Sequence, residues 1–175
     1  MLREQALVIG EVTLSSGRTA QYYVDARRAL LSAPGFTALG ELVVDEARRL
    51  GAVAVGGPTL GADPIACSAL AVPDCGLNAF IVRKDRKEHG LQRWIEGPEI
   101  PAGASVLVVE DVVTSGGSLI TAIERLREEG IRIAGALAVV DRLAGGREAI
   151  GAALEGRPYT ALFTIDDVYP ERPDS

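Results

Sequence analysis

Residues 106–118 read VLVVEDVVTSGGS. The four apolar residues at 106–109 predict a buried strand, which runs directly into two carboxylates, Glu110 and Asp111. A turn rich in threonine, serine and glycine follows, and the apolar spacing of residues 119–126 then predicts a helix. Strand, polar turn and helix in this order indicate one unit of an α/β fold.

The same alternation extends on both sides. The helix after the turn should end at Gly130, and Pro34-Gly35 should break the chain before an earlier helix. We also expect Gly56-Gly57-Pro58 to form a turn and the hydrophilic residues 83–98 to stay outside the core. Strands are predicted at residues 52–55, 77–82, 106–109, 131–140 and 160–165, and helices at residues 36–50, 64–72, 119–129 and 146–154. This order predicts a central, mainly parallel sheet flanked by helices, with ligands bound at the carboxyl ends of its strands.

Length and composition indicate one soluble domain covering residues 1–175, because 47% hydrophobic and 24% charged residues suit a chain with its own core. No apolar run is long enough to cross a membrane, and residues 1–5 lack the apolar core of a signal peptide. The net charge of −6 argues against a nucleic-acid binder. Cys67 and Cys75 fit no metal motif and are expected to be buried free thiols. We therefore expect a cytoplasmic protein.

The turn after the two carboxylates is typical of an anion site. Hydroxyls and glycine amides at the start of a helix suit a phosphate monoester. The carboxylates of Glu110 and Asp111 repel phosphate, so they are expected to face sugar hydroxyls or Mg²⁺. The sequence contains neither a Walker A loop nor a G-x-G-x-x-G fingerprint. The alternative is an ordinary strand-to-helix loop that is capped by Ser118 and has solvated acids.

Residues 83–90, RKDRKEHG, gather the two lysines and the single histidine of the chain, Lys84, Lys87 and His89. Every other cation is an arginine. Lysine is a flexible point charge, so a hydrophilic loop that carries several cations suits closure over a polyanion such as pyrophosphate. The alternative is a solvated surface loop.

These two segments together resemble a known family. Residues 106–118 resemble the 5-phosphoribosyl 1-pyrophosphate (PRPP) motif of type I phosphoribosyltransferases, in which the acids contact the ribose hydroxyls and the following loop holds the 5′-phosphate. The spacing Arg-Lys-x-x-Lys-x-His-Gly at residues 83–90 resembles the mobile catalytic loop of orotate phosphoribosyltransferases, which usually closes over PRPP in the partner subunit.

Three further segments support this resemblance. Residues 14–25, LSSGRTAQYYVD, resemble the N-terminal element that lines the orotate end of the site. Residues 56–64 resemble the pyrophosphate-binding loop, and residues 139–142 resemble the strand end whose arginine pairs with the orotate carboxylate. Ser15 and Leu60 depart from the pattern, because many relatives carry a basic residue at these two positions.

The resemblance implies a type I phosphoribosyltransferase fold with a small N-terminal hood at residues 1–35 and a mobile loop at residues 83–98. It implies Mg²⁺ as cofactor, held through the pyrophosphate and not directly by the protein, and a homodimer in which the loop acts in the partner's site. The implied catalytic residues are Arg83, Lys84, Lys87, His89 and Asp111. The implied PRPP-binding residues are Arg83, Lys84, Lys87, His89, Glu110, Asp111, Val112, Val113, Thr114, Ser115, Gly116, Gly117, Ser118, Thr59, Leu60 and Gly61. The implied orotate-binding residues are Thr114, Arg142, Tyr22 and Tyr23.

The implied reaction joins PRPP and orotate to give orotidine 5′-monophosphate and pyrophosphate, a step of de novo pyrimidine synthesis. Two alternatives remain open. A phosphoribosyltransferase for purines would keep the acids and the phosphate loop but would not need the basic loop or Arg142. A regulator of the same fold would bind nucleic acid and use PRPP as a signal; the acidic net charge counts against it.

Overall fold

The computed structural model describes residues 1–13, 19–85 and 94–173. Its elements, in chain order, are α1 (Leu2–Gln5), β1 (Leu7–Thr13), β2 (Thr19–Val24), α2 (Arg27–Leu30), α3 (Ala33–Leu50), β3 (Ala54–Pro58), α4 (Asp63–Leu70), β4 (Asn78–Val82), β5 (Ile95–Glu96), β6 (Ser105–Val113), α5 (Gly117–Glu128), β7 (Arg132–Asp141), α6 (Gly146–Leu154), β8 (Tyr159–Thr164) and α7 (Ile165–Val168).

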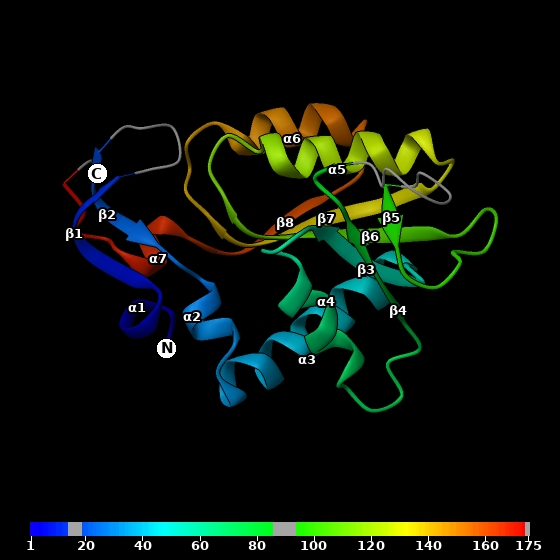
Figure 1. The fold of residues 1–175 in the computed structure, drawn as a ribbon, viewed down its shortest axis with the longest axis horizontal. Helices are drawn as coiled ribbons and strands as arrows, with labels where there is room; N and C mark the ends of the chain where they lie inside the picture. The colour runs from blue at the N-terminus through cyan, green and yellow to red at the C-terminus, as the bar shows by residue number, and fades with distance from the viewer. Residues whose placement is uncertain (14–18, 86–93, 174–175) are drawn as a thin grey trace.

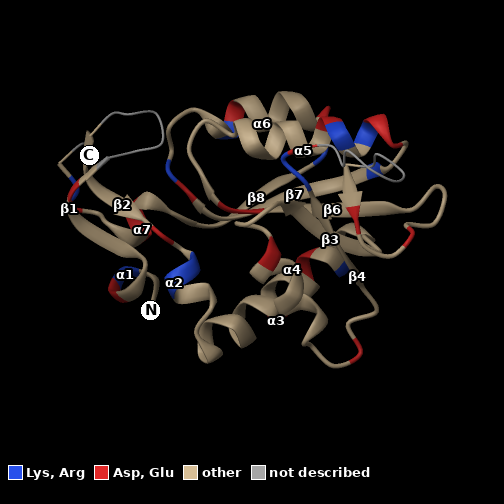
Figure 2. Ribbon diagram, viewed as in Figure 1, with Lys and Arg blue, Asp and Glu red and all other residues tan. Residues whose placement is uncertain are grey.

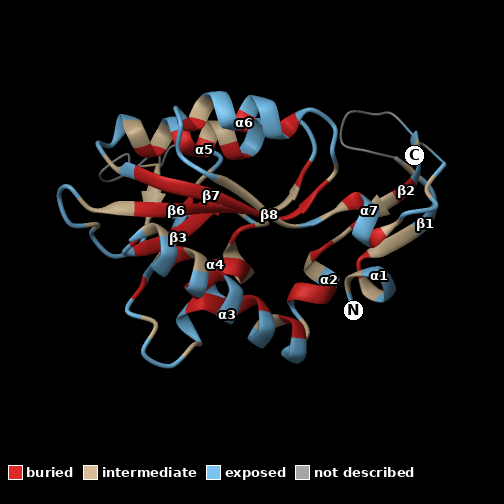
Figure 3. Ribbon diagram, turned by 180° about the vertical axis from the view of Figure 1, so that it is seen from behind, coloured by how far each residue is buried: buried red, intermediate tan, exposed pale blue. Residues whose placement is uncertain are grey.

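The central sheet has the strand order β5-β4-β3-β6-β7-β8. Its neighbours pair in parallel from β4 to β8, and only the short edge strand β5 runs antiparallel. Helices α5 and α6 cover one face and α3 and α4 cover the other (Figure 1). Figure 3 shows the buried residues concentrated in β3, β6 and β7 and on the inner sides of these helices. The mainly parallel α/β sheet flanked by helices is therefore confirmed.

Helix α5 illustrates why these residues form these elements. Its apolar positions Leu119, Ala122, Ile123 and Leu126 are all buried against the sheet. Gly130 has a φ of +75°, and the amide N–H of Ile131 donates to the carbonyl of Leu126 at 2.9 Å. Such a left-handed glycine ends the helix by satisfying its last carbonyls, as the sequence predicted.

The N-terminal elements form a separate antiparallel pair, β1 with β2, beside the helices α1 and α2. They lie at one end of the central sheet together with α7 (Figure 1). A hydrogen bond from Nε of Arg3 to the carbonyl of Asp167 (2.9 Å) joins α1 to α7. These elements and α7 therefore lie together at one end of the central sheet (Figure 1).

Two expected boundaries are wrong. Helix α3 includes Pro34 and Gly35 in its first turn, where proline needs no donor, and the Ser32 side chain caps the helix by accepting from the Gly35 amide at 3.2 Å. The expected turn at Gly56-Gly57-Pro58 is the end of β3. A Cβ on Gly56 would collide with the Phe80 carbonyl of the neighbouring strand, so the glycine serves close strand packing.

Three further points refine the predictions. Residues 83–98 contribute the short strand β5, which pairs with β4. The cysteines are free, as expected, but Cys67 is exposed and Cys75 half-buried, because Cys67 lies on the outer side of α4 while Ile65, Ala66 and Ala69 face the core. Within the described residues no helix is long and apolar enough to span a membrane.

Candidate active site

A cleft of about 660 Å³ opens at the carboxyl ends of β3, β4 and β6, next to the start of α5. It brings together the predicted acids, the loop after β3 and part of the phosphate loop. The side chains and backbone that line it belong to Tyr23, Arg27, Pro58, Thr59, Leu60, Gly61, Lys84, Glu110, Asp111, Gly117, Ser118, Thr121 and Arg125.

The two acids lie in the last part of β6, which continues through them to Val113. Glu110 is 7% exposed. Burial, followed by the negative charge of Asp111, raises the pKa of Glu110 to about 9. Glu110 is therefore protonated at neutral pH and can donate a hydrogen bond, whereas the Oδ1 atom of Asp111 accepts from the Val112 amide at 2.8 Å.

The loop after β3 packs directly on this acid pair. A Cβ on Gly61 would overlap the Oδ1 atom of Asp111 and would lie 2.8 Å from Oε1 of Glu110. Only a residue without a side chain allows the loop to approach so closely. The predicted pyrophosphate loop, Thr59 to Gly61, and the acid pair thus form one continuous surface. The peptide bond between Thr59 and Leu60 is cis.

The predicted phosphate loop turns from β6 into α5 at residues 114–116. Gly116, with a φ of +82°, is the N-terminal cap of α5, and no side chain makes a capping hydrogen bond there. Ser118 lies inside the first turn and lines the cleft instead of capping the helix. The alternative of a loop capped by Ser118 is therefore wrong, and the amide end of a 12-residue helix faces the cleft.

The basic loop is described only at its two ends. Lys84 lines the cleft, whereas the guanidinium of Arg83 pairs with Glu96 across the β4–β5 hairpin at 3.2 Å. Lys87 and His89 lie outside the described residues, as do Ser15 and the rest of residues 14–18. Their predicted roles, and the role of Arg83 at the pyrophosphate, stay predictions.

Arg125 of α5 fixes the described ends of this loop. It donates to the carbonyls of Arg83 and of Lys84, the latter at 2.9 Å. Its guanidinium lies 3.9 Å from the centre of the Trp94 ring, and the Trp94 amide donates to Glu129 at 2.9 Å. Helix α5 therefore holds both the phosphate loop at its start and the base of the basic loop near its end.

Arg142 lies outside the lining of this cleft, directly after β7. Its amide donates to the Val113 carbonyl at 2.8 Å, which places it beside the end of β6. Its Nη2 atom donates to the Tyr22 hydroxyl at 3.0 Å, while its Nε atom is buried and makes no hydrogen bond within the described residues. Tyr22 is 5% exposed and packs edge-on against Tyr169, with ring centres 5.3 Å apart.

Of the other predicted orotate contacts, Tyr23 lines the cleft from the opposite side of β2 to Tyr22. Thr114 lies in the turn after β6. The neighbour of Arg142, Asp141, is fully buried and accepts from the Leu143 amide at 2.9 Å and from the Tyr159 hydroxyl at 3.2 Å. These bonds fix the backbone turn from which Arg142 projects.

Sequence reasoning missed Arg27, Thr121 and Arg125. A signal was available for two of them, because Gly117, Thr121 and Arg125 are spaced by four residues and so share one face of a helix. Arg27 follows the recognised segment 14–25 by two positions, but nothing in the sequence indicated that α2 would turn its side chain toward the acids.

Known proteins of similar sequence define the class. The phosphoribosyl transferase domain matches residues 48–160. The chain is 48% identical to the orotate phosphoribosyltransferase of Corynebacterium glutamicum (strain R), covering 96% of this chain and 90% of that protein. It is 46% identical to the orotate phosphoribosyltransferase of Streptomyces avermitilis, covering 95% and 92%.

Solved structures agree. Orotate phosphoribosyltransferase of Mycobacterium tuberculosis H37Rv in complex with Fe(III) dicitrate superposes with a TM-score of 0.85 at 43% identity, covering 96% of this chain and 94% of that chain. The complex of the same enzyme with PRPP gives a TM-score of 0.79 at 39% identity, covering 95% and 93%. The fold is thus that of a phosphoribosyltransferase. More narrowly, the chain belongs to the orotate phosphoribosyltransferase family.

Proposed function

We propose that this chain transfers the 5-phosphoribosyl group of PRPP to orotate, giving orotidine 5′-monophosphate and pyrophosphate in pyrimidine synthesis. The names of its relatives and the PRPP complex of the mycobacterial enzyme support this substrate pair. The single observation that carries the proposal is the packing of Gly61 on Glu110 and Asp111 in one cleft, because it joins a pyrophosphate loop to a ribose-binding acid pair.

In this proposal the phosphate loop, residues 114–118, holds the 5′-phosphate with its hydroxyls and amides at the start of α5. Asp111 accepts hydrogen bonds from the ribose hydroxyls, and protonated Glu110 both donates and accepts. The bond between ribose C1 and the pyrophosphate oxygen breaks while the bond from C1 to the orotate nitrogen forms, and the proton of that nitrogen leaves with the pyrophosphate or to water. Positive charge develops at C1, and the reaction needs no covalent intermediate with the enzyme. Catalysis therefore comes from positioning the two substrates and from neutralising the charge of the leaving pyrophosphate.

The proposed cofactor is Mg²⁺, held through the pyrophosphate of PRPP and not directly by the protein. Among the described residues, no group of three metal-binding side chains is close enough to hold an ion. Mg²⁺ typically keeps several waters and binds substrate phosphates, which suits an ion that enters the cleft with PRPP. When bound with PRPP, the ion would neutralise the leaving group.

The remaining cations are assigned by proposal. Lys84 and Lys87, with Arg83 and His89, contact the departing pyrophosphate, and the loop of one subunit acts in the site of its partner in a homodimer. Arg142 pairs with the orotate carboxylate, because its buried Nε atom and its fork-shaped donor set suit a bidentate carboxylate. Tyr22, Tyr23 and Thr114 complete the orotate end.

We place the enzyme in the cytoplasm and assign it no nucleic-acid partner. Basic and acidic residues are interspersed along the ribbon instead of forming one basic face (Figure 2). This distribution supports small anionic substrates over a polyanion that would need a continuous basic surface.

The experiment that tests the proposal follows pyrophosphate release from PRPP and Mg²⁺ by the purified protein. Orotate, hypoxanthine, guanine, adenine and uracil are offered separately. We expect release with orotate alone. Release with a purine would keep the acids and the phosphate loop but overturn the assignment of orotate. PRPP binding without release for any base would favour the regulator.

A further inference from the structure

A bound pyrophosphate would bring further negative charge to a cleft that already contains Glu110 and Asp111. Within the described residues, Arg27, Lys84 and Arg125 are the basic side chains that line it. Arg125 already uses both terminal nitrogens on the carbonyls of Arg83 and Lys84. Lys84 stands on the β4 side, so the opposite side has Arg27 as its basic group.

The loop on that opposite side supplies no charge of its own. Its central residue, Leu60, is 69% exposed beside the cleft. An exposed leucine contributes neither a hydrogen bond nor a charge to an anion. Backbone amides of the Thr59–Gly61 loop would have to hold a pyrophosphate without help unless another element brings a cation.

Arg27, the first residue of α2, can supply this missing positive charge. Its Nε atom lies 2.9 Å from Oδ1 of Asp25 and 4.0 Å from Oδ2 of Asp111. The hydrogen bond and charge of Asp25 raise the pKa of Arg27, so the guanidinium stays charged. Both contacts are made through Nε, so they leave the two terminal amino groups of Arg27 unused; the side chain is 40% exposed and lines the cleft.

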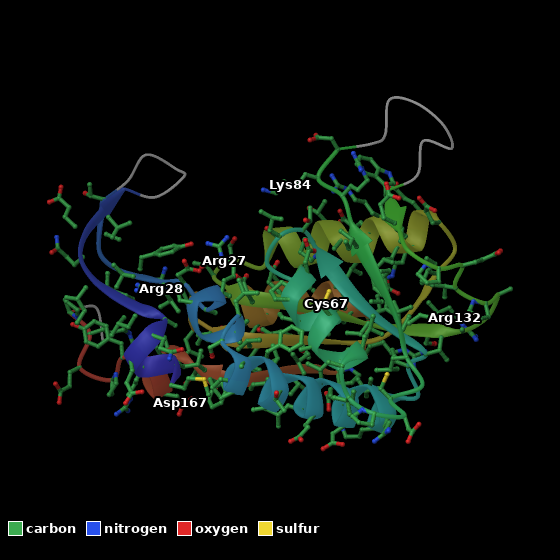
Figure 4. All side chains as sticks on the ribbon, turned by 60° about the horizontal axis from the view of Figure 1, so that its bottom comes forward. Arg27, Arg28, Cys67, Lys84, Arg132 and Asp167 are labelled. Carbon is green, nitrogen blue, oxygen red and sulfur yellow. The ribbon has the colours of Figure 1, made fainter. Side chains whose placement is uncertain are left out.

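We propose that Arg27 is a PRPP-binding residue that grips the pyrophosphate group against the Thr59–Gly61 loop, with Asp25 holding its guanidinium in place. The proposal rests on the proposed function and extends it to a residue of the N-terminal elements. Figure 4 shows Arg27 on α2 and Lys84 at the end of β4, so two cations from distant parts of the chain approach the cleft from different elements. A planar fork suits two phosphate oxygens at once.

If Arg27 had only a structural role, its contact with Asp25 would stabilise α2. Any substitution of Arg27 would then act by lowering the stability of α2. A binding role instead ties the loss to the anion, and a cation supplied from a neighbouring position should restore it. Leu60 is that position, because it lines the same cleft and its side chain is exposed.

The test measures the affinity for Mg²⁺-pyrophosphate by calorimetry. We expect Arg27→Gln to weaken binding roughly 10- to 100-fold, the range for a lost charge-assisted hydrogen bond. The matched control is Arg28→Gln, since Arg28 is the next residue of α2, exposed, and does not line the cleft. Arg28→Gln should bind as the wild type does.

The rescue variant is Arg27→Gln combined with Leu60→Arg. Recovery of most of the lost affinity, with the melting temperature unchanged from Arg27→Gln, would support direct binding. An Arg27→Gln variant that binds within twofold of the wild type would overturn the proposal, as would an equal loss in Arg28→Gln. This assay contains no base, so its result is independent of turnover with orotate. A protein that does not use orotate would contradict the proposed function but would leave Arg27 as a pyrophosphate ligand.

Discussion

At the scale of single residues, the most informative group is the guanidinium of Arg142. Its Nη2 atom is used by Tyr22, but its buried Nε atom makes no hydrogen bond within the described part of the chain. A buried donor of this kind is costly unless a ligand satisfies it. This supports a carboxylate-bearing base at this end of the site.

Arg142→Lys keeps the positive charge but loses the fork. We expect orotate to bind roughly 10- to 100-fold more weakly, as for the loss of a charge-assisted hydrogen bond, with a smaller change for PRPP because Arg142 does not line the cleft. Equilibrium binding of each substrate separately checks this. Tyr22→Phe, which removes only the hydroxyl partner, is the control and should cost less; unchanged orotate affinity in Arg142→Lys would show that the base binds elsewhere.

The buried position of Glu110 should make the stability of the folded protein depend on pH. Its pKa is raised from 4.5 to about 9 by burial and by Asp111. Folding therefore favours the protonated form of Glu110. The contribution of protonated Glu110 to the free energy of unfolding is fully present below pH 4.5 and is lost as the pH rises toward 9. We expect Glu110→Gln to melt at a higher temperature than the wild type, by a margin that grows between pH 5 and pH 9.

Thermal unfolding of both proteins across this range measures the effect. Glu124→Gln, at an exposed position of α5, is the control and should show no growing margin. Parallel curves for Glu110→Gln and the wild type would mean that Glu110 ionises freely in the folded protein.

At the scale of the elements, periodicity predicted the helices and strands that bury an apolar stripe or run. The stripe of α5 and its end at Gly130 are confirmed because they depend on neighbours along the chain. The prediction for Gly56-Gly57-Pro58 was wrong for a tertiary reason, because these glycines allow strands to pack closely. The prediction for Pro34-Gly35 was wrong because proline fits the first turn of a helix, here capped by Ser32. The pairing of β1 with β2 depends on partners that no local pattern reveals.

The contacts of Arg125 connect α5 to the basic loop, and the fluorescence of Trp94 can test them. Trp94 is the only tryptophan of the chain, so its fluorescence reports on this contact alone. Arg125→Met removes the stacked guanidinium and the bonds to the carbonyls of Arg83 and Lys84. We expect emission at longer wavelength, because the ring becomes more hydrated, and lower turnover, because Lys84 loses its fixed position.

The control for this measurement is Arg127→Met. Arg127 lies on the same helix but pairs with Glu155, at 3.2 Å, away from the tryptophan. Emission in Arg125→Met that matches both the control and the wild type would contradict a fixing role for Arg125.

At the scale of the whole molecule, the sequence predicted the part of the site that follows the strand ends. Glu110, Asp111 and the Thr59–Gly61 loop meet because parallel strands end at one edge of a sheet. Arg27 could not be predicted, because it reaches the cleft from a separate group of elements. Arg142 was implied by the resemblance of residues 139–142 to a family segment, but its separation from the lined cleft is a finding of the structure.

The proposed homodimer predicts complementation between two inactive variants. Lys87→Ala lacks a working loop residue and Asp111→Asn lacks the ribose acid. If the loop acts in the partner's site, a mixed dimer contains one intact site, and random 1:1 mixing should give about a quarter of wild-type turnover. Turnover no higher than that of either variant alone, in a sample where mixed dimers form, would contradict action across the dimer.

We propose that phosphoribosyl transfer to orotate takes place at the acid pair on β6. The most direct measurement is the formation of orotidine 5′-monophosphate from PRPP, Mg²⁺ and orotate by the wild type and by Asp111→Asn. We expect rapid formation by the wild type and a loss of at least about 100-fold in Asp111→Asn, with the melting temperature of the variant within a few degrees of the wild type. No product from the wild type, or equal rates for the two proteins, would contradict it.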